Sequence, residues 1–199
     1  MNKTLKCALA VVVAVAALHG APTTTSRAEQ TATVPPVVEE VLLLALVGPD
    51  GEYSAYADYA AIIRKHGRVQ PYVWIQQAET RHISALERQF QKYGLAVPPN
   101  RYLGAPEVPA TLPEAAAEAI AAEERNVAMY ERLLAKVTEY PDLTRVLGHL
   151  QHCSREMHLP ALREAAAHGG KVDASEVPPC GRGGGMGCPN CGCCGRRGR

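Results

Sequence analysis

Apolar residues recur every three or four positions through the middle of the 199-residue chain, and this helical period is the pattern that most limits its fold. Alternating apolar and polar stretches of the kind that predict strands are missing from this region. The periodic part covers about residues 36–170, the length of a single domain. We therefore predict an all-α domain over residues 36–170.

Turn-forming residues divide this region into four predicted helices. They cover about 37–66 with a break at 48–51, 71–93, 113–138 and 142–168 with a bend at Pro160. The connection between the second and third helices has about twenty residues and is rich in proline, whereas the other connections are short. This pattern favours a ferritin-like antiparallel four-helix bundle, with one long crossover between helices two and three, over a simple up-and-down bundle.

The second predicted helix carries a carboxylate and an imidazole on the face that should be buried. Glu79 and His82 are three residues apart, so they lie one turn apart on the same face as Ile75 and Leu86. Burying an unpaired carboxylate costs on the order of several kcal/mol. This pair therefore requires partners if the face is buried.

Each of the other predicted helices also places one such side chain on its apolar face: Glu52, Glu123 and His158. Taken singly, Glu52 fits a solvated acid at a helix start, His158 fits a hydrogen-bonded core residue, and a small shift of helix phase would expose Glu123 or its neighbour Glu124. Together, four helices that direct oxygen and nitrogen ligands inward supply what a carboxylate-bridged pair of iron or manganese ions requires. We therefore predict a buried metal site formed by Glu52, Glu79, His82, Glu123 and His158.

Three tyrosines, Tyr56, Tyr59 and Tyr130, are predicted on inner helix faces near these carboxylates. A buried phenol either packs against its neighbours or donates a hydrogen bond to a polar group. Packing is the simpler expectation for all three.

Residues 1–28 have the pattern of a secretory signal peptide, with two early lysines, an apolar run and small residues before a cleavage site after Ala28. Cleavage after Gly20 and an uncleaved anchor are the alternatives. The apolar run at 8–18 is too short for a comfortable membrane span. We therefore expect a periplasmic or secreted protein without an integral membrane span after cleavage.

Residues 171–199 are rich in glycine, cysteine and arginine, which predicts a disordered tail. Five of the seven cysteines lie there. Closely spaced thiolates can bind zinc or copper, whereas disulfides are the other expectation in an oxidising compartment.

Charge and surface composition limit the partners of the domain. Without the basic residues of the signal segment and the four tail arginines, 14 basic residues remain against 20 acidic ones, a net charge near −6. This balance argues against a nucleic-acid partner. The leucine-rich run at 41–46 offers more apolar surface than one helix face needs, which predicts a homodimer.

Four segments of the chain resemble the ferritin-like superfamily, in particular its rubrerythrin branch, and more closely an uncharacterised bacterial ferritin-like domain family. They read DGEYSAYADYAAIIRKHG, PYVWIQQAETRHISALERQFQKYGLAVP, AAEERNVAMYERLLA and LQHCSREMHLPAL. By this resemblance the five predicted ligands correspond to the metal ligands of the superfamily, which uses a di-iron centre to react with peroxide or oxygen, to oxidise ferrous iron or for other redox work. Glu79 and Glu123 are then the expected bridging ligands, and the other three are terminal.

One position departs from the superfamily pattern, which places a second glutamate and histidine pair, three residues apart, on the fourth helix. Position 155 should then be a carboxylate, but it is Arg155, and Glu156 points to another side of an ideal helix. A site with three carboxylates and two histidines is expected to hold two metal ions asymmetrically, one ion, or none.

Two functions follow from these features. The first is an exported metal-binding protein with a di-iron or related dinuclear site and peroxide- or oxygen-linked redox activity, which would be an oxidoreductase if it is an enzyme. The second is a non-enzymatic envelope bundle with a degenerate site that uses the cysteine-rich tail for attachment or metal sequestration. A purely structural or cytokine-like bundle fits less well, because it predicts apolar residues in place of Glu79 and Glu123.

Overall fold

The computed structural model describes residues 33–104, 106–173 and 175. The described helices are α1 (Pro36–Val47), α2 (Glu52–His66), α3 (Tyr72–Lys92), α4 (Leu112–Lys136), α5 (Pro141–Cys153), the π-helical turn η1 (Ser154–His158) and α6 (Leu159–Ala167). Within the described residues there is no strand, and one isolated bridge pairs Gln70 with Val172. The predicted all-α class is therefore confirmed for this part of the chain. The predicted helix ends lie within two residues of the observed ones.

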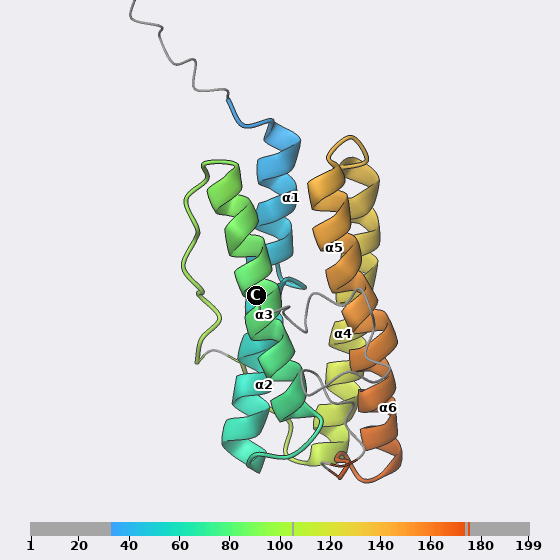
Figure 1. Ribbon diagram of the computed structural model, residues 1–199. Coiled ribbons are helices and arrows are strands. Elements are labelled where there is room, and N and C mark those ends of the chain that lie inside the picture. Colours follow the sequence, from blue (N-terminus) through green and yellow to red (C-terminus); the bar gives the residue numbers. More distant parts are fainter. Residues whose placement is uncertain (1–32, 105, 174, 176–199) are drawn as a thin grey trace, which may run out of the picture. The chain divides into compact units, whose positions relative to one another are not determined.

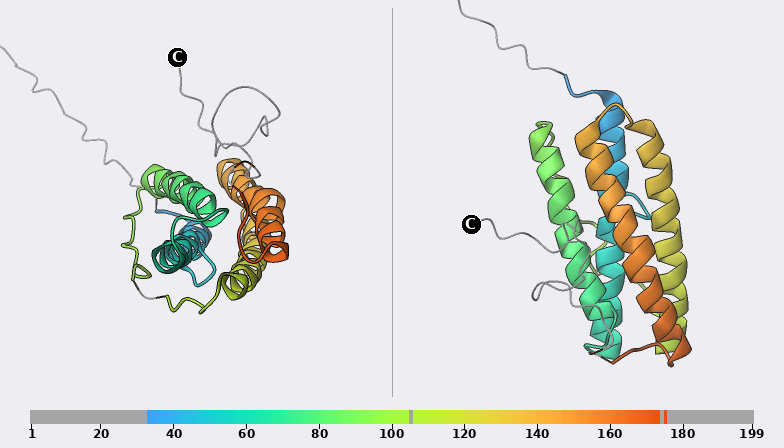
Figure 2. Two further views of the ribbon diagram at one scale, coloured as in Figure 1. Left: turned by 90° about the horizontal axis from the view of Figure 1, so that it is seen from below. Right: turned by 45° about the vertical axis from the view of Figure 1, so that its right-hand side comes forward.

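The helices form the columns of a bundle (Figure 1). α1 and α2 follow one another along one column and are separated by the predicted break at 48–51. α5, η1 and α6 are continuous and form another column, while α3 and α4 form one each. The end-on view in Figure 2 shows these columns packed around a common centre. The described residues thus form a four-column helical bundle.

A long connection over residues 93–111 joins α3 to α4 (Figure 1). The two helices run in the same direction, so this connection returns along the outside of the bundle from the end of α3 to the start of α4. Hydrogen bonds hold this connection to the first column. The Tyr53 hydroxyl donates to the Pro98 carbonyl over 3.1 Å, the Tyr102 hydroxyl to the Val47 carbonyl over 3.0 Å, and the Lys65 ammonium to the Val108 carbonyl over 2.6 Å. The connection is therefore an attached part of the fold.

Local sequence signals explain where α4 begins and where α3 ends. Thr111 and Glu114 form a reciprocal capping box at the start of α4, with each side chain bonded to the other residue's backbone N–H. Gly94 follows α3 with a φ of +69°, the left-handed conformation that favours glycine after a helix. These two signals fix the ends of the long connection.

The apolar core is divided into two clusters along the bundle. The first apolar cluster contains Val38, Val41, Leu42, Ala45, Leu46, Tyr53, Leu86, Phe90, Met129, Tyr130, Leu133, Val137, Leu143, Leu147 and Leu150. The second apolar cluster contains Tyr59, Ile62, Tyr72, Trp74, Ile75, Ala115, Ala119 and Leu162. In α3 and α4, the residues between the two sets include Glu79, His82 and Glu123.

Most of the leucine-rich run at 41–46 is used inside the bundle. Val41, Leu42, Ala45 and Leu46 are buried, and Leu44 is 38% exposed. Little of this run is therefore left for a second copy, and the homodimer stays a prediction. No helix among the described residues combines the length and the apolar content that a membrane crossing requires.

The fourth column departs from α-helical geometry at a different place from the one predicted. The sequence predicted a bend at Pro160, but the departure is the π-helical turn at Ser154–His158. Pro160 lies in the first turn of α6, directly after this change in hydrogen bonding.

Two neighbouring glycines provide a test of the packing at the end of the bundle. Gly169 and Gly170 both have positive φ, but a Cβ at Gly170 would lie 2.3 Å from the carbonyl carbon of Leu112, whereas a Cβ at Gly169 meets nothing within 4 Å. We expect Gly169→Ala to lower the free energy of unfolding by about 1 kcal/mol, because of its φ, and Gly170→Ala to lower it by about 2 kcal/mol more. Chemical denaturation followed by circular dichroism measures both, and equal losses would contradict this close approach.

Candidate metal centre

The structure brings all five predicted ligands together inside the bundle. Glu52 comes from the start of α2, Glu79 and His82 from α3, Glu123 from α4 and His158 from η1. None of them is more than 3% exposed. The solvated alternative for Glu52 is therefore wrong, and the phase of α4 leaves Glu124 on the surface, paired with Arg163.

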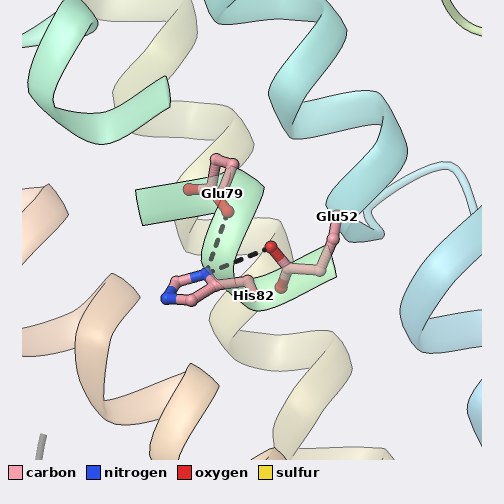
Figure 3. A group of neighbouring side chains, drawn as sticks. All are labelled: Glu52, Glu79 and His82. Carbon is pink, nitrogen blue, oxygen red and sulfur yellow. Dashed lines mark hydrogen bonds and ion pairs between the residues drawn. The ribbon is translucent and has the colours of Figure 1, made fainter. Parts of the chain in front are cut away.

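The two imidazoles connect the three carboxylates. His82 Nδ1 lies 3.2 Å from Glu52 Oε2 and 2.9 Å from Glu79 Oε2. Figure 3 shows the imidazole between these two carboxylates. His158 Nδ1 lies 3.2 Å from Glu79 Oε1 and 3.2 Å from Glu123 Oε1. Each oxygen of Glu79 thus faces a different histidine. We call these five side chains the buried cluster.

The buried cluster contains two groups of residues that can hold a metal ion. One group is Glu52, Glu79 and His82, and the other is Glu79, Glu123 and His158. In each group one ligand atom from every residue lies within 4.8 Å of the others. Glu79 belongs to both groups, as expected for a bridging ligand, whereas Glu123 belongs to one.

Two buried tyrosines close the ends of the buried cluster. The Tyr59 hydroxyl donates to Glu123 Oε1 over 2.7 Å, and the Tyr130 hydroxyl donates to Glu52 Oε1. Burial and the adjacent carboxylate raise the pKa of each phenol well above its usual value, so both phenols remain hydrogen-bond donors at neutral pH. Tyr56 is half-buried, and no hydrogen bond joins it to the cluster within the described part of the chain.

Burial and mutual charge set the protonation of the buried cluster. Burial and the neighbouring Glu79 carboxylate raise the pKa of Glu52 to about 8. Burial raises the pKa of Glu79, but the two histidines and the Glu52 hydrogen bond outweigh it and hold this pKa well below its usual value. Burial lowers the pKa of His158, but the Glu123 and Glu79 carboxylates outweigh it and raise this pKa to about 10. At neutral pH, protons therefore balance much of the negative charge.

Ring packing fixes the orientation of the histidines. The His82 and His158 rings stack with centroids 5.5 Å apart and an angle of 24° between planes. The Trp74 ring meets the His158 ring edge-on, with centroids 5.6 Å apart and an angle of 82°. Both imidazoles are thus held with Nδ1 toward the carboxylates.

Arg155 does not enter the buried cluster, although it occupies the position expected for a carboxylate. In a π-helical turn, with about 4.4 residues per turn, residues four apart share a face more closely than residues three apart. Ser154 and His158 are accordingly buried, whereas Arg155 is exposed. A carboxylate at position 155, which the superfamily pattern calls for, would therefore lie outside the buried cluster of this chain.

Sequence reasoning assigned no role to Asn126, which is buried beside the buried cluster. Its amide donates to the carbonyl of Asp50 over 2.9 Å, and its amide oxygen accepts a 3.0 Å hydrogen bond from the Ser154 hydroxyl. Asn126 therefore connects the start of α2 to η1. Its position three residues after Glu123 on α4 is the signal that could have revealed it.

The raised pKa values predict how stability depends on pH for protein prepared with a chelator. Glu52 and His158 each bind a proton more tightly when folded, so their contribution is complete below the unfolded pKa values of 4.5 and 6.5 and is lost as pH rises through about 8 and about 10. We expect the free energy of unfolding to fall by on the order of 5 kcal/mol between pH 6 and pH 8.5, about half of it from each group. Urea denaturation at each pH measures it.

The matched variant for this pH experiment is Glu52→Gln, which keeps the shape of the side chain and removes its titration. Its free energy of unfolding should fall less steeply over the same interval, because one of the two titrating groups is gone. A free energy that is constant or rises with pH in the unsubstituted protein would contradict the raised pKa values.

Comparisons with protein-family models, curated proteins and solved structures found no match for this chain.

Proposed function

We propose that this chain is an exported, ferritin-like metal-binding protein whose buried cluster holds a pair of metal ions. Iron is the first candidate for the metal, and manganese is the alternative. A single ion in place of a pair is the alternative for the number of ions. The observation that carries the proposal is that two groups of potential ligands share the carboxylate of Glu79. A bridged pair of ions requires one carboxylate that offers one oxygen to each ion, and Glu79 is placed to do so.

The donor chemistry supports a transition metal. Carboxylate and imidazole ligands together suit iron, manganese and zinc. Both groups of potential ligands consist of glutamate and histidine alone. Three buried carboxylates are costly without positive charge, which bound cations would supply. Metal binding would release the protons that otherwise balance this charge.

The proposed roles follow the hydrogen-bond partners. Glu52 and His82 would complete one half of the centre, Glu123 and His158 the other half, and Glu79 would bridge them. Tyr130 and Tyr59 would orient the outer carboxylates by donating to one oxygen of each. An iron pair held here would supply redox chemistry toward oxygen or peroxide, so the proposed activity is that of an oxidoreductase.

Two further features support the ferritin-like and exported parts of the proposal. α3 and α4 run in the same direction and are joined by a long connection, as in bundles with a single crossover. The signal-peptide pattern at residues 1–28, which lie outside the described residues, supports export.

One observation favours the alternative of a non-enzymatic envelope bundle with a degenerate site. A continuous series of hydrogen bonds and ion pairs already joins the five side chains and the two tyrosines. A cluster satisfied in this way is compatible with a fold that binds no metal. The tail proposed for attachment or metal sequestration is described only at residues 171–173 and 175, and its five cysteines lie outside the described residues.

Elemental analysis of the full chain, purified without chelator, tests the proposal. We expect about two iron or manganese ions per chain in the unsubstituted protein and in the control Glu124→Gln, whose carboxylate is on the surface. Glu79→Gln should lose both ions because it removes the shared ligand. Metal bound by the tail is common to all variants and cancels. Equal metal content in Glu79→Gln and Glu124→Gln would contradict the proposal.

The sharing of Glu79 has a separate test in the stoichiometry of single variants. Glu52→Gln and Glu123→Gln each remove a ligand from one half only. We expect each to retain about one ion per chain, while Glu79→Gln retains none. Equilibrium dialysis against Mn²⁺ measures the stoichiometry. Equal losses in all three variants would show that Glu79 has no special place among the ligands.

A further inference from the structure

A cavity of about 320 Å³ lies between α2, α4 and residues 106–109 of the α3–α4 connection. Its wall includes Tyr59 and Glu123, the pair joined by the 2.7 Å hydrogen bond. The cavity is not lined by Glu52, Glu79, His82 or His158. Of the five residues of the buried cluster, Glu123 is therefore the one that faces this space.

The wall of the cavity is negatively charged. Asp58 on α2, Glu107 in the connection and Glu118 on α4 contribute carboxylates. The guanidinium of Arg125 also lies in the wall, but its Nε donates to Asp50 Oδ1 over 3.1 Å, so these two charges offset one another. The remaining acidic groups favour a cation and disfavour an anion.

The size of the cavity fits a hydrated metal ion. Six water molecules at about 30 Å³ each occupy about 180 Å³, so a divalent cation with its first hydration shell fits within the space. Pro109, Ala119 and Ala122 supply apolar wall between the acidic groups. An ion in the cavity is therefore attracted by charge, and it can lose water to the Glu123 carboxylate at the inner wall.

We infer that this cavity is the route by which a hydrated divalent cation reaches the buried cluster, and that the half containing Glu123 and His158 is loaded before the half containing Glu52 and His82. The inference rests on the proposed function, because it names the path to the proposed centre. Glu79, which belongs to both groups, is the ligand through which the second half is reached.

The single tryptophan of the chain provides the signal for a test. The Trp74 ring lies 5.6 Å from the ring of His158, so a paramagnetic ion bound beside His158 should quench its fluorescence. Stopped-flow mixing of the chelator-treated full chain with Mn²⁺ then measures the rate of loading. Equilibrium dialysis of the same samples measures how much Mn²⁺ is bound in the end.

Charge removal in the cavity is the first arm of the test. We expect the double variant Asp58→Asn/Glu118→Gln to load about ten times more slowly than the unsubstituted chain at low ionic strength, with unchanged final stoichiometry. The difference should shrink to about twofold or less in about 0.5 M NaCl, because salt screens these charges. The matched control is Glu131→Gln/Glu139→Gln, which removes two exposed carboxylates outside the cavity.

Filling the cavity is the second arm and does not depend on charge. Ala122 is a half-buried residue of the wall, and Ala122→Phe should slow loading at low and at high salt while the final stoichiometry stays the same. Loading by both cavity variants at the rate of the control would overturn the route while leaving the proposed function intact. A chain that binds no Mn²⁺ at equilibrium would contradict the proposed function itself.

Discussion

The position of the Glu79 carboxylate, buried between two histidines, is the constraint on which the rest of the bundle depends. Its two oxygens face His82 and His158, which come from different columns, and each histidine also reaches one further carboxylate. Such a group can be buried only if positive charge surrounds it, whether from protonated imidazole or from a cation. The helices are arranged so that this requirement is met within a single layer of the bundle.

Residues that contact more than one segment of the chain surround the buried cluster. Asn126 joins the carbonyl before α2 to the π-helical turn, so the break between α1 and α2 and the irregular fourth column are fixed through the same side chain. The long connection is held to the first column and lines the cavity beside Glu123. The break between α1 and α2, the π-helical turn and the long connection are thus all located around the buried cluster.

The sequence was sufficient to predict the all-α class, the helix ends and the five residues of the buried cluster, because each depends on local spacing that α-helical geometry converts directly into a face. The π-helical turn could not be predicted in this way, since it depends on a local change in backbone hydrogen bonding that the spacing of apolar residues does not reveal. The roles of Asn126 and of the cavity wall depend on residues far apart in the chain. Tyr56 is half-buried, and among the described residues it makes no hydrogen bond to the buried cluster.

The division of the core into two apolar clusters has a consequence for cooperativity. The hydrogen-bonded series begins at Tyr130, a member of the first apolar cluster, and ends at Tyr59, a member of the second. The buried cluster therefore connects two hydrophobic cores through its hydrogen bonds. With this connection intact we expect the two ends of the bundle to unfold as one unit, and with it broken we expect each core to become a separate unit of local unfolding with its own amide-exchange protection.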